Sequence, residues 1–242
     1  MDIQGFFQNK RKAGWRTIKM ILENNYGKII NHKKIIEIMQ KYHLKTIIRR
    51  KKKRRRIADI ASDGTLYQNV LNRNFEQQKP NSAYCTDISY LQYQRNNTAY
   101  LSALKDIASG EIIAYTLSQT LELDFVIKMI KTAVELTPPA CLDKLILHSD
   151  RGGHYRSLVY QKLLKKYGIT QSMSEPGNCL DNAPIESFFG HLKDDIDYKK
   201  CKTFEELEDM VKNYVYNYNN NRYQWNKNKM TPVQYKQYLL AA

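Results

Sequence analysis

The sequence predicts an α/β protein in which a mixed β-sheet carries helices on its faces. Three runs rich in Tyr, Ile, Leu and Thr occupy residues 83–93, 98–106 and 111–119, and short ArgAsnAsn and SerGly turns separate them. Helical and strand-like patterns then alternate along the chain. Strands that come first and then alternate with helices indicate a mixed sheet flanked by helices.

The alternating part supplies two further strands. A helix over residues 123–136 has an apolar stripe and ends at two prolines. The apolar run at 145–147 is typical of a short strand buried on both faces. A helix over 155–167 and a strand over 169–173 follow. The sheet therefore has five predicted strands.

The next predicted helix begins near Pro184, with Asn182 or Asp181 as its cap. At 100° per residue its apolar side chains share one face, and Glu186 and Lys193 lie together on the adjoining flank. A negative charge in the first turn is favoured by the helix dipole, by roughly 0.3–1 kcal/mol.

Two more helices close the chain. Thr203 and Glu206 form a capping box for a helix that runs to about residue 219, and Thr231 with Pro232 starts a last short one. Between them lies AsnArgTyrGlnTrp, residues 221–225. This aromatic segment either stacks on nucleotide bases or cements two helices together.

Two short helices are predicted before residue 46, and Asn31 caps the second. The outer face of the second helix shows Lys33 and Lys34. The pair is either part of a helix-turn-helix whose second helix enters a DNA groove, or a helical pair that only packs. No third helix is evident before Trp15.

Charge is concentrated at the start of the chain. Residues 1–60 hold 18 Lys and Arg against 4 Asp and Glu, whereas the other 182 residues hold 21 against 20. A basic appendage on a neutral body favours a nucleic-acid partner. Eight consecutive cations fill residues 49–56, and the predicted phosphate contacts among them are Arg49, Arg50, Lys51, Lys52, Arg54 and Arg55.

These patterns divide the chain into four parts. Residues 1–48 form a helical, helix-turn-helix-like region, 49–80 a basic linker, 81–198 the main domain and 199–242 a helical extension.

Several classes of protein are excluded by composition. The four cysteines, at positions 85, 141, 179 and 201, form no CxxC pair, which argues against a zinc module and a disulfide framework. No apolar run reaches the length of a membrane span, and the first residues lack the order of a signal peptide. We expect a soluble, cytoplasmic protein.

Three acidic residues are the candidate site. Asp87 lies within a predicted strand, Asp150 follows the buried strand, and Glu186 lies in a helix's first turn, with 35 residues between the last two. Taken singly, each acid is as readily structural or solvated. Together they would repel one another unless a cation intervened, and Mg²⁺ suits such oxygen ligands and phosphodiester chemistry. Lys193 is placed to hold a DNA phosphate or is a surface lysine.

HisSerAsp at 148–150 also suggests a nucleophile triad. Ser149 lacks the GxSxG setting, and a histidine on a buried strand is more often a core residue. We therefore discount this reading.

The motifs resemble those of a known family. SerAlaTyrCysThrAspIleSerTyr, HisSerAspArgGlyGlyHisTyr and the block from SerMetSerGluProGlyAsn to PhePheGlyHisLeuLys are similar to the three signature blocks of IS-three-type insertion-sequence transposases, relatives of retroviral integrases. LeuAsnArgAsnPhe in the linker and the closing TyrAsnTyrAsnAsnAsnArgTyrGlnTrp with ThrProValGlnTyr extend the resemblance over nearly the whole chain.

The resemblance implies a ribonuclease-H-like core with Asp87, Asp150 and Glu186 as catalytic and metal-binding residues. Two Mg²⁺ ions, or Mn²⁺ in their place, are the implied cofactors, and Lys193 is implied to contact the transposon end. The implied reaction is nicking at the element's ends, followed by attack of the freed 3′-hydroxyl on target DNA. Transposon ends, target DNA and other copies of the chain in a homo-multimer on paired ends are the implied partners, in a bacterial cytoplasm and at the nucleoid.

The sequence departs from the family pattern in a few places. Tyr84 stands where Trp is usual, and His154 where Gln is common. Family members have more sequence ahead of the helical pair, and an upstream reading frame often supplies end recognition, so the resemblance also suggests a frameshift partner or a truncated copy. The alternatives are an inactive remnant that only binds DNA and a general nuclease of the same fold.

Overall fold

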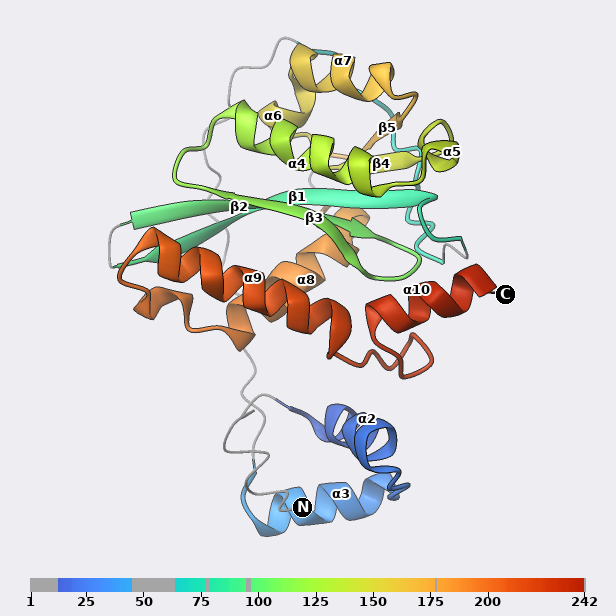
Figure 1. Ribbon diagram of the computed structural model, residues 1–242, viewed down its shortest axis with the longest axis vertical. Coiled ribbons are helices and arrows are strands. Elements are labelled where there is room, and N and C mark those ends of the chain that lie inside the picture. The colour runs from blue at the N-terminus through green and yellow to red at the C-terminus, as the bar shows by residue number, and fades with distance from the viewer. Residues whose placement is uncertain (1–12, 45–63, 77–78, 95–96, 177, 242) are drawn as a thin grey trace.

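The computed structural model describes residues 13–44, 64–76, 79–94, 97–176 and 178–241. Its centre is a five-stranded sheet in the order β3-β2-β1-β4-β5 (Figure 1). The strands are β1 (Ala83–Tyr93), β2 (Asn97–Asp106), β3 (Ile112–Ser118), β4 (Ile146–Ser149) and β5 (Thr170–Met173). All five strands predicted from the sequence are present, with ends that differ by one or two residues.

The sheet is mixed, as the sequence predicts. β1, β2 and β3 form an antiparallel meander, whereas β4 pairs with β1 and β5 pairs with β4 in parallel. The parallel half needs helical crossovers. The chain supplies them with α4 (Leu123–Leu136) and the short α5 (Pro139–Leu142) before β4, and with α6 (Gly153–Arg156) and α7 (Leu158–Lys166) before β5.

The prediction of one helix over residues 155–167 is wrong in one respect. The structure has two helices there, α6 and α7, which are separated at Ser157. Ser157 has extended backbone angles and its side chain accepts a hydrogen bond from the Tyr160 N–H, so it caps a new helix. A serine that caps the backbone in this way competes with helix continuation.

Helices cover both faces of the sheet (Figure 1). On the first face, Tyr84, Leu104 and Leu147 pack with α4 and α7. On the other face, Ala83 and Cys85 pack with α8 (Ala183–Asp195) and α9 (Phe204–Asn220). Alternate residues of β1 thus enter different cores, as the two-residue period of a strand requires. Short 3₁₀ turns, η1 (Cys179–Asn182) and η2 (Tyr198–Lys200), flank α8.

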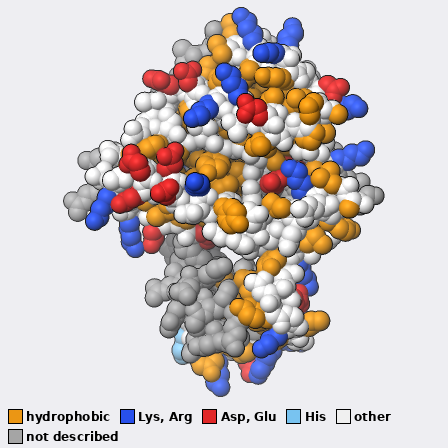
Figure 2. Space-filling model, in the orientation of Figure 1, with side chains coloured by type: hydrophobic (Ala, Val, Ile, Leu, Met, Phe, Trp, Pro, Cys, Tyr) orange, Lys and Arg blue, Asp and Glu red, His pale blue; other side chains and the backbone are white. Residues whose placement is uncertain are grey.

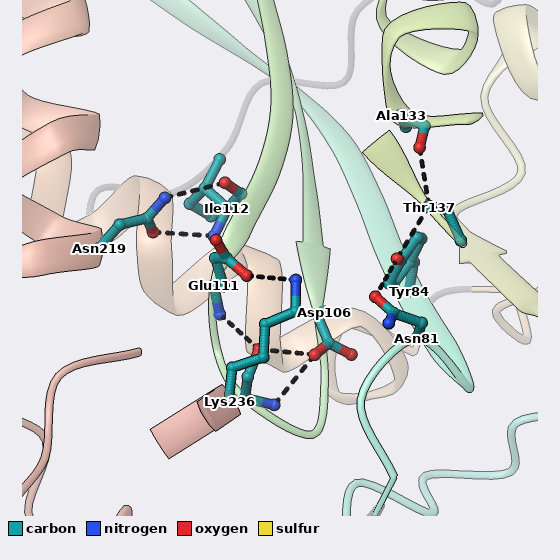
Figure 3. Close-up of polar contacts among 10 residues, drawn as sticks. Asn81, Tyr84, Asp106, Glu111, Ile112, Ala133, Thr137, Asn219 and Lys236 are labelled. Atoms are coloured by element: carbon teal, nitrogen blue, oxygen red, sulfur yellow. Dashed lines mark hydrogen bonds and ion pairs between the residues drawn. The ribbon is translucent and has the colours of Figure 1, made fainter. Parts of the chain in front are cut away.

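The C-terminal helices are fastened to the sheet by polar contacts (Figure 3). The Asn219 side chain accepts from the Ile112 N–H and donates to the Ile112 carbonyl, both at 2.9 Å. Lys236 in α10 (Pro232–Ala241) pairs with Glu111 at 2.7 Å. The predicted cap of α9 is present, since Thr203 accepts from the Glu206 N–H, and α10 begins where Thr231 and Pro232 predict, with Thr231 accepting from the Gln234 N–H.

Part of the predicted linker packs on the core. Leu71 is buried in the core beneath α8 and α9, and its N–H donates to the Ser172 hydroxyl. Residues 49–63, which include the basic run, lie outside the described residues. The limits of the four predicted parts stay predictions.

The N-terminal unit consists of α2 (Trp15–Tyr26) and α3 (His32–Lys41). Asn31 caps α3 by accepting from the Lys33 N–H, as predicted. A small core of Ala13, Ile18, Leu22 and Ile35 holds the two helices together. Within the described part of the chain, no helix has the length and apolar character needed to cross a bilayer.

Replacing Asn219 by Ala should destabilise the fold. The change leaves the N–H and carbonyl of Ile112 without their partner, at a cost of about 1–3 kcal/mol. Urea unfolding at neutral pH measures the difference. Asn220→Ala is the matched control, because Asn220 bonds only within its own helix, to the Tyr216 carbonyl. Equal stabilities of the two variants would contradict the anchoring role.

Candidate active site

Asp87 lies in β1, and Asp150 directly follows the neighbouring strand β4. In the parallel pairing of β1 with β4, Cys85 lies opposite His148. Asp87 lies two residues further along β1, and Asp150 lies just past the end of β4; the charges of both carboxylates act on Tyr155. Adjacent strands are about 4.8 Å apart. The sequence alone did not show this pairing, which places the segments that carry the two acids side by side.

The loop after β4 is shaped around Asp150. The Asp150 Oδ1 accepts from the Gly152 N–H at 2.9 Å, and a Cβ added at Gly152 would lie only 2.9 Å from that oxygen. A side chain at position 152 would therefore push the Asp150 carboxylate out of its present position. Arg151 ties this loop to the next one by donating to the Ser174 carbonyl at 2.8 Å and pairing with Glu175.

Glu186 comes from α8, whose first turn is docked on the centre of the sheet. The Asn182 side chain donates to the Thr86 carbonyl at 3.0 Å, next to Asp87 in the chain. The buried Lys105 donates to the Pro184 carbonyl at 3.0 Å. Ile185 is fully buried and Glu186 is half-buried. The Asn182 side chain therefore bonds to β1 and does not cap α8.

Asp181 is an anchor for this helix that the sequence reasoning treated only as a possible cap. Its side chain is 2% exposed and pairs with Arg73 at 2.6 Å. It also accepts from Asn69 at 3.2 Å and from the Glu175 N–H at 2.9 Å. Burial alone would raise the pKa of the Asp181 carboxyl, but the hydrogen bonds from Arg73 and the Glu175 N–H hold it below its ordinary value. One carboxylate thus joins three segments beside the candidate site.

Tyr155 is a second residue that sequence reasoning did not single out. It is buried on α6, directly after the Asp150 loop. Burial raises the pKa of its phenol well above the ordinary value, and the charges of Asp87 and Asp150 raise it further. The phenol therefore stays neutral beside both acids. The only signal for it in the sequence is its place in the HisSerAspArgGlyGlyHisTyr block.

The three acids do not form a ready-made metal cluster. Among the described residues, no three His, Cys, Asp or Glu side chains are grouped so that they could hold a metal ion as they stand. Asp87 is 8% exposed and its Oδ1 accepts from the Ile88 N–H, whereas Asp150 is exposed. The structure pairs the strand of Asp87 with the strand that precedes Asp150, and the helix that carries Glu186 docks on β1. Joint metal binding by all three stays a prediction.

His148 is a core residue, as expected. Its two ring nitrogens lie 2.9 Å from the Ser172 hydroxyl and 3.0 Å from the Ser174 hydroxyl. Burial lowers its pKa to about 4. Both nitrogens of this neutral imidazole are engaged with serine hydroxyls, so it does not act as a base for Ser149. The Ser149 hydroxyl donates instead to the Asp150 carbonyl.

The predicted DNA contacts are only partly within the described residues. Lys193 lies in the last turn of α8, two turns after Glu186, and is half-buried. Lys33 and Lys34 are exposed on α3, where Lys34 pairs with Glu37. The six residues named in the basic run, from Arg49 to Arg55, lie outside what the structure describes.

One face of the molecule is unsuited to DNA. Acidic side chains gather over the start of α9 (Figure 2), where Glu205 and Glu206 occupy the first turn. Carboxylates there complement the helix dipole and would repel phosphates. This patch at the start of α9 is therefore unfavourable for contact with DNA.

The fold and the paired acids define the class of an integrase core. The model of the integrase core domain matches residues 77–179, and a second integrase core model matches residues 186–240. An HTH-like domain model matches residues 1–52, which favours the first of the two readings of the helical pair.

Curated relatives narrow the class to a family. A transposase-like protein of Haemophilus influenzae is 39% identical over 208 residues, which are 86% of this chain and 93% of that protein. The "Putative transposase InsK for insertion sequence element IS150" of Escherichia coli (strain K12) is 35% identical over 96% of this chain and 80% of its own length. The chain belongs to the IS-three-type family of insertion-sequence transposases.

Solved structures show the same fold in viral proteins. The HTLV-2 integrase catalytic core domain, in complex with magnesium, matches with a TM-score of 0.51 at 18% identity over 65% of this chain and 97% of that one. A chain of the simian T-cell lymphotropic virus intasome matches with a TM-score of 0.55 at 16% identity, over 86% of this chain and 67% of that one. The ribonuclease-H-like core expected from the sequence is therefore confirmed.

Replacing Arg73 by Ala should loosen the segment that leads into α8. The buried Asp181 carboxylate loses its ion pair, at a cost of about 1–3 kcal/mol once the exposure of Arg73 is allowed for. Since the pKa of Asp181 is lowered, this stabilisation is present above its ordinary value of 3.8 and is lost as the pH falls through the folded-state value. Urea unfolding at neutral and acid pH measures both effects.

The matched control for Arg73 is Lys200→Ala, whose ion pair with Asp197 is exposed on both sides. That variant should unfold within about 0.5 kcal/mol of the unaltered protein. Arg73→Ala and the unaltered protein should differ less in their free energy of unfolding at acid pH. The same difference at acid and neutral pH would contradict the ion-pair account.

Proposed function

We propose that this protein is an active DNA transposase that nicks the ends of its element and joins the freed 3′-hydroxyl to target DNA. Membership in the family supports DNA transposition in general. The observation that supports the finer proposal is the parallel pairing of β1, which carries Asp87, with β4, which leads into Asp150, with α8 docked on β1. A remnant without activity would not need to keep that arrangement.

Asp87, Asp150 and Glu186 fit divalent metal by the chemistry of their donors. Three carboxylates offer the hard oxygen ligands that Mg²⁺ and Mn²⁺ take. Two such ions, when bound, would activate the attacking oxygen and stabilise the leaving one. Because the acids are not grouped around a metal position as they stand, we propose that the half-buried Glu186 side chain turns toward the two strand acids when metal and DNA bind.

Other residues of the chain would position the DNA. Lys193 lies two turns beyond Glu186 in the same helix, where it is placed to pair with a phosphate close to the acids. Lys33 and Lys34 on α3, and the cations at 49–56, would hold the flanking duplex. The neutral Tyr155 would lie near Asp87 and Asp150 without adding charge.

We further propose that the chain acts as a homo-multimer on paired ends. The solved relatives are described as trimeric and dimeric catalytic cores and as an intasome. An upstream-frame protein as a further member of the assembly stays a prediction from the family resemblance.

Substituting any one of the three acids should abolish both nicking and strand transfer. We expect Asp87→Asn, Asp150→Asn and Glu186→Gln each to lose at least about a hundredfold in rate, because each removes an oxygen ligand while keeping the shape. Assays on DNA carrying the terminal repeats, with Mg²⁺ or Mn²⁺, measure this. Retention of the same DNA should be nearly unchanged.

Asp143→Asn is the control, since Asp143 is an exposed carboxylate in the turn before β4. Full activity in Glu186→Gln would reject the three-acid site. Hydrolysis without joining would identify a nuclease, and DNA retention without any metal-dependent cutting by the unaltered protein would identify a DNA-binding remnant.

Replacing Lys193 by Ala should weaken the complex with the cleaved end. One lost phosphate contact lowers the log–log salt dependence of binding by about 0.9 on duplex DNA. Binding titrations across a range of salt concentrations measure this slope. Lys200→Ala removes an equal charge from the exposed η2 turn and should leave the slope unchanged; equal slopes in the two variants would argue against a contact at Lys193.

A further inference from the structure

The loop between α9 and α10, residues 221–231, contacts the N-terminal helix α2. The Trp15 and Trp225 rings meet edge to face, with centroids 5.7 Å apart. The Tyr223 hydroxyl donates to the Asn25 side-chain carbonyl at 2.5 Å. Segments about 200 residues apart in the sequence are thus joined by their side chains.

Lys229 adds charge and a backbone contact to this interface. Its ammonium group pairs with Glu23 at 2.7 Å and lies 5.5 Å from the centre of the Trp225 ring. Its carbonyl accepts from the Asn24 side chain at 3.1 Å. The interface therefore combines an aromatic pair, an ion pair and two neutral hydrogen bonds.

The loop is a shaped platform on the core. Asn228 and Lys229 both have positive φ, which side-chain-bearing residues adopt rarely. The Gln224 N–H donates to the Met230 carbonyl at 2.9 Å, which closes the loop. Lys227 reaches down to the carbonyls of Ile107 and Ala108, in the turn between β2 and β3. A path of direct contacts thus runs from α2 through this loop to the central sheet.

The helical pair has a small core of its own, in which Ala13, Ile18, Leu22 and Ile35 lie between α2 and α3. The contact with the loop therefore adds position and orientation. Lys33 and Lys34 remain exposed on α3 while α2 is docked.

We propose that the α9–α10 loop is a docking platform for the chain's own helical pair. It fixes the distance and direction from α3 to the acid site, and so selects which phosphodiester is cut. The second part rests on the proposed function, since it requires α3 to hold the transposon end. Trp225 serves as a protein contact in this arrangement and does not stack on a DNA base.

A measurement without DNA tests the docking itself. Trp15 and Trp225 are the two tryptophans of the chain, and indoles held in contact give a paired exciton band in circular dichroism. Lys229→Glu places a carboxylate against Glu23 and should remove the band. Glu23→Lys combined with Lys229→Glu restores opposite charges and should recover it. Lys200→Glu is the control, with the same change of charge on the remote η2 turn.

A cleavage assay on end DNA tests the consequence. Lys229→Glu should cut at the native position at least about tenfold more slowly, with cuts spread to neighbouring phosphodiesters, because misplacement costs rate steeply. Its affinity for end DNA should match that of Lys200→Glu, and the double variant should regain the native cut.

The outcomes separate the two proposals. An unchanged cut pattern in Lys229→Glu, after loss of the exciton band, would overturn the platform role. Absence of the band in the unaltered protein would overturn the docking. A loss of end affinity beyond that of Lys200→Glu would make Lys229 a DNA contact instead. If the unaltered protein cuts no DNA, the proposed function fails, while the band still decides whether the helical pair is docked.

Discussion

The parallel pairing of β1 with β4 is the constraint on which the rest of the site depends. Cys85 opposite His148 fixes the register, and this register sets the segment of Asp87 next to the strand that leads into Asp150. A slip of one residue would turn one of the acids to the other face of the sheet. Burial prevents such a slip, since Tyr84 and Cys85 fill two different cores on opposite sides of the same strand.

The third acid is positioned by a different kind of contact. α8 lies on the sheet through the buried Ile185 and Phe188, and polar bonds from Asn182 and Lys105 set where its first turn begins. Asp181 then fastens the preceding loop to Arg73, far away in the sequence. These contacts set the position of the half-buried Glu186 relative to β1.

Departures from the family pattern have local explanations. Tyr84, where Trp is usual, is buried and its hydroxyl donates to Asn81 at 2.7 Å and lies 3.0 Å from the Thr137 hydroxyl (Figure 3). The phenol thus joins the start of β1 to the end of α4. His154, where Gln is common, has its Nε2 3.0 Å from the Leu121 carbonyl, a polar contact that an amide also can make. Neither residue touches the three acids in the contacts described.

The sequence by itself determined the elements and the chemistry of the candidate site. Alternation, caps and apolar runs predict all five strands and most helices, because these signals are local. They do not predict the break at Ser157, because whether a serine continues a helix or caps a new one depends on its surroundings. The acids were found through their motifs. Their register across β1 and β4, the anchoring of α8 by Arg73 and Asp181, the neutral Tyr155 and the contact of Trp15 with Trp225 were decided by the tertiary structure alone. Each joins segments that are distant in the chain, and no local pattern encodes which of them will meet.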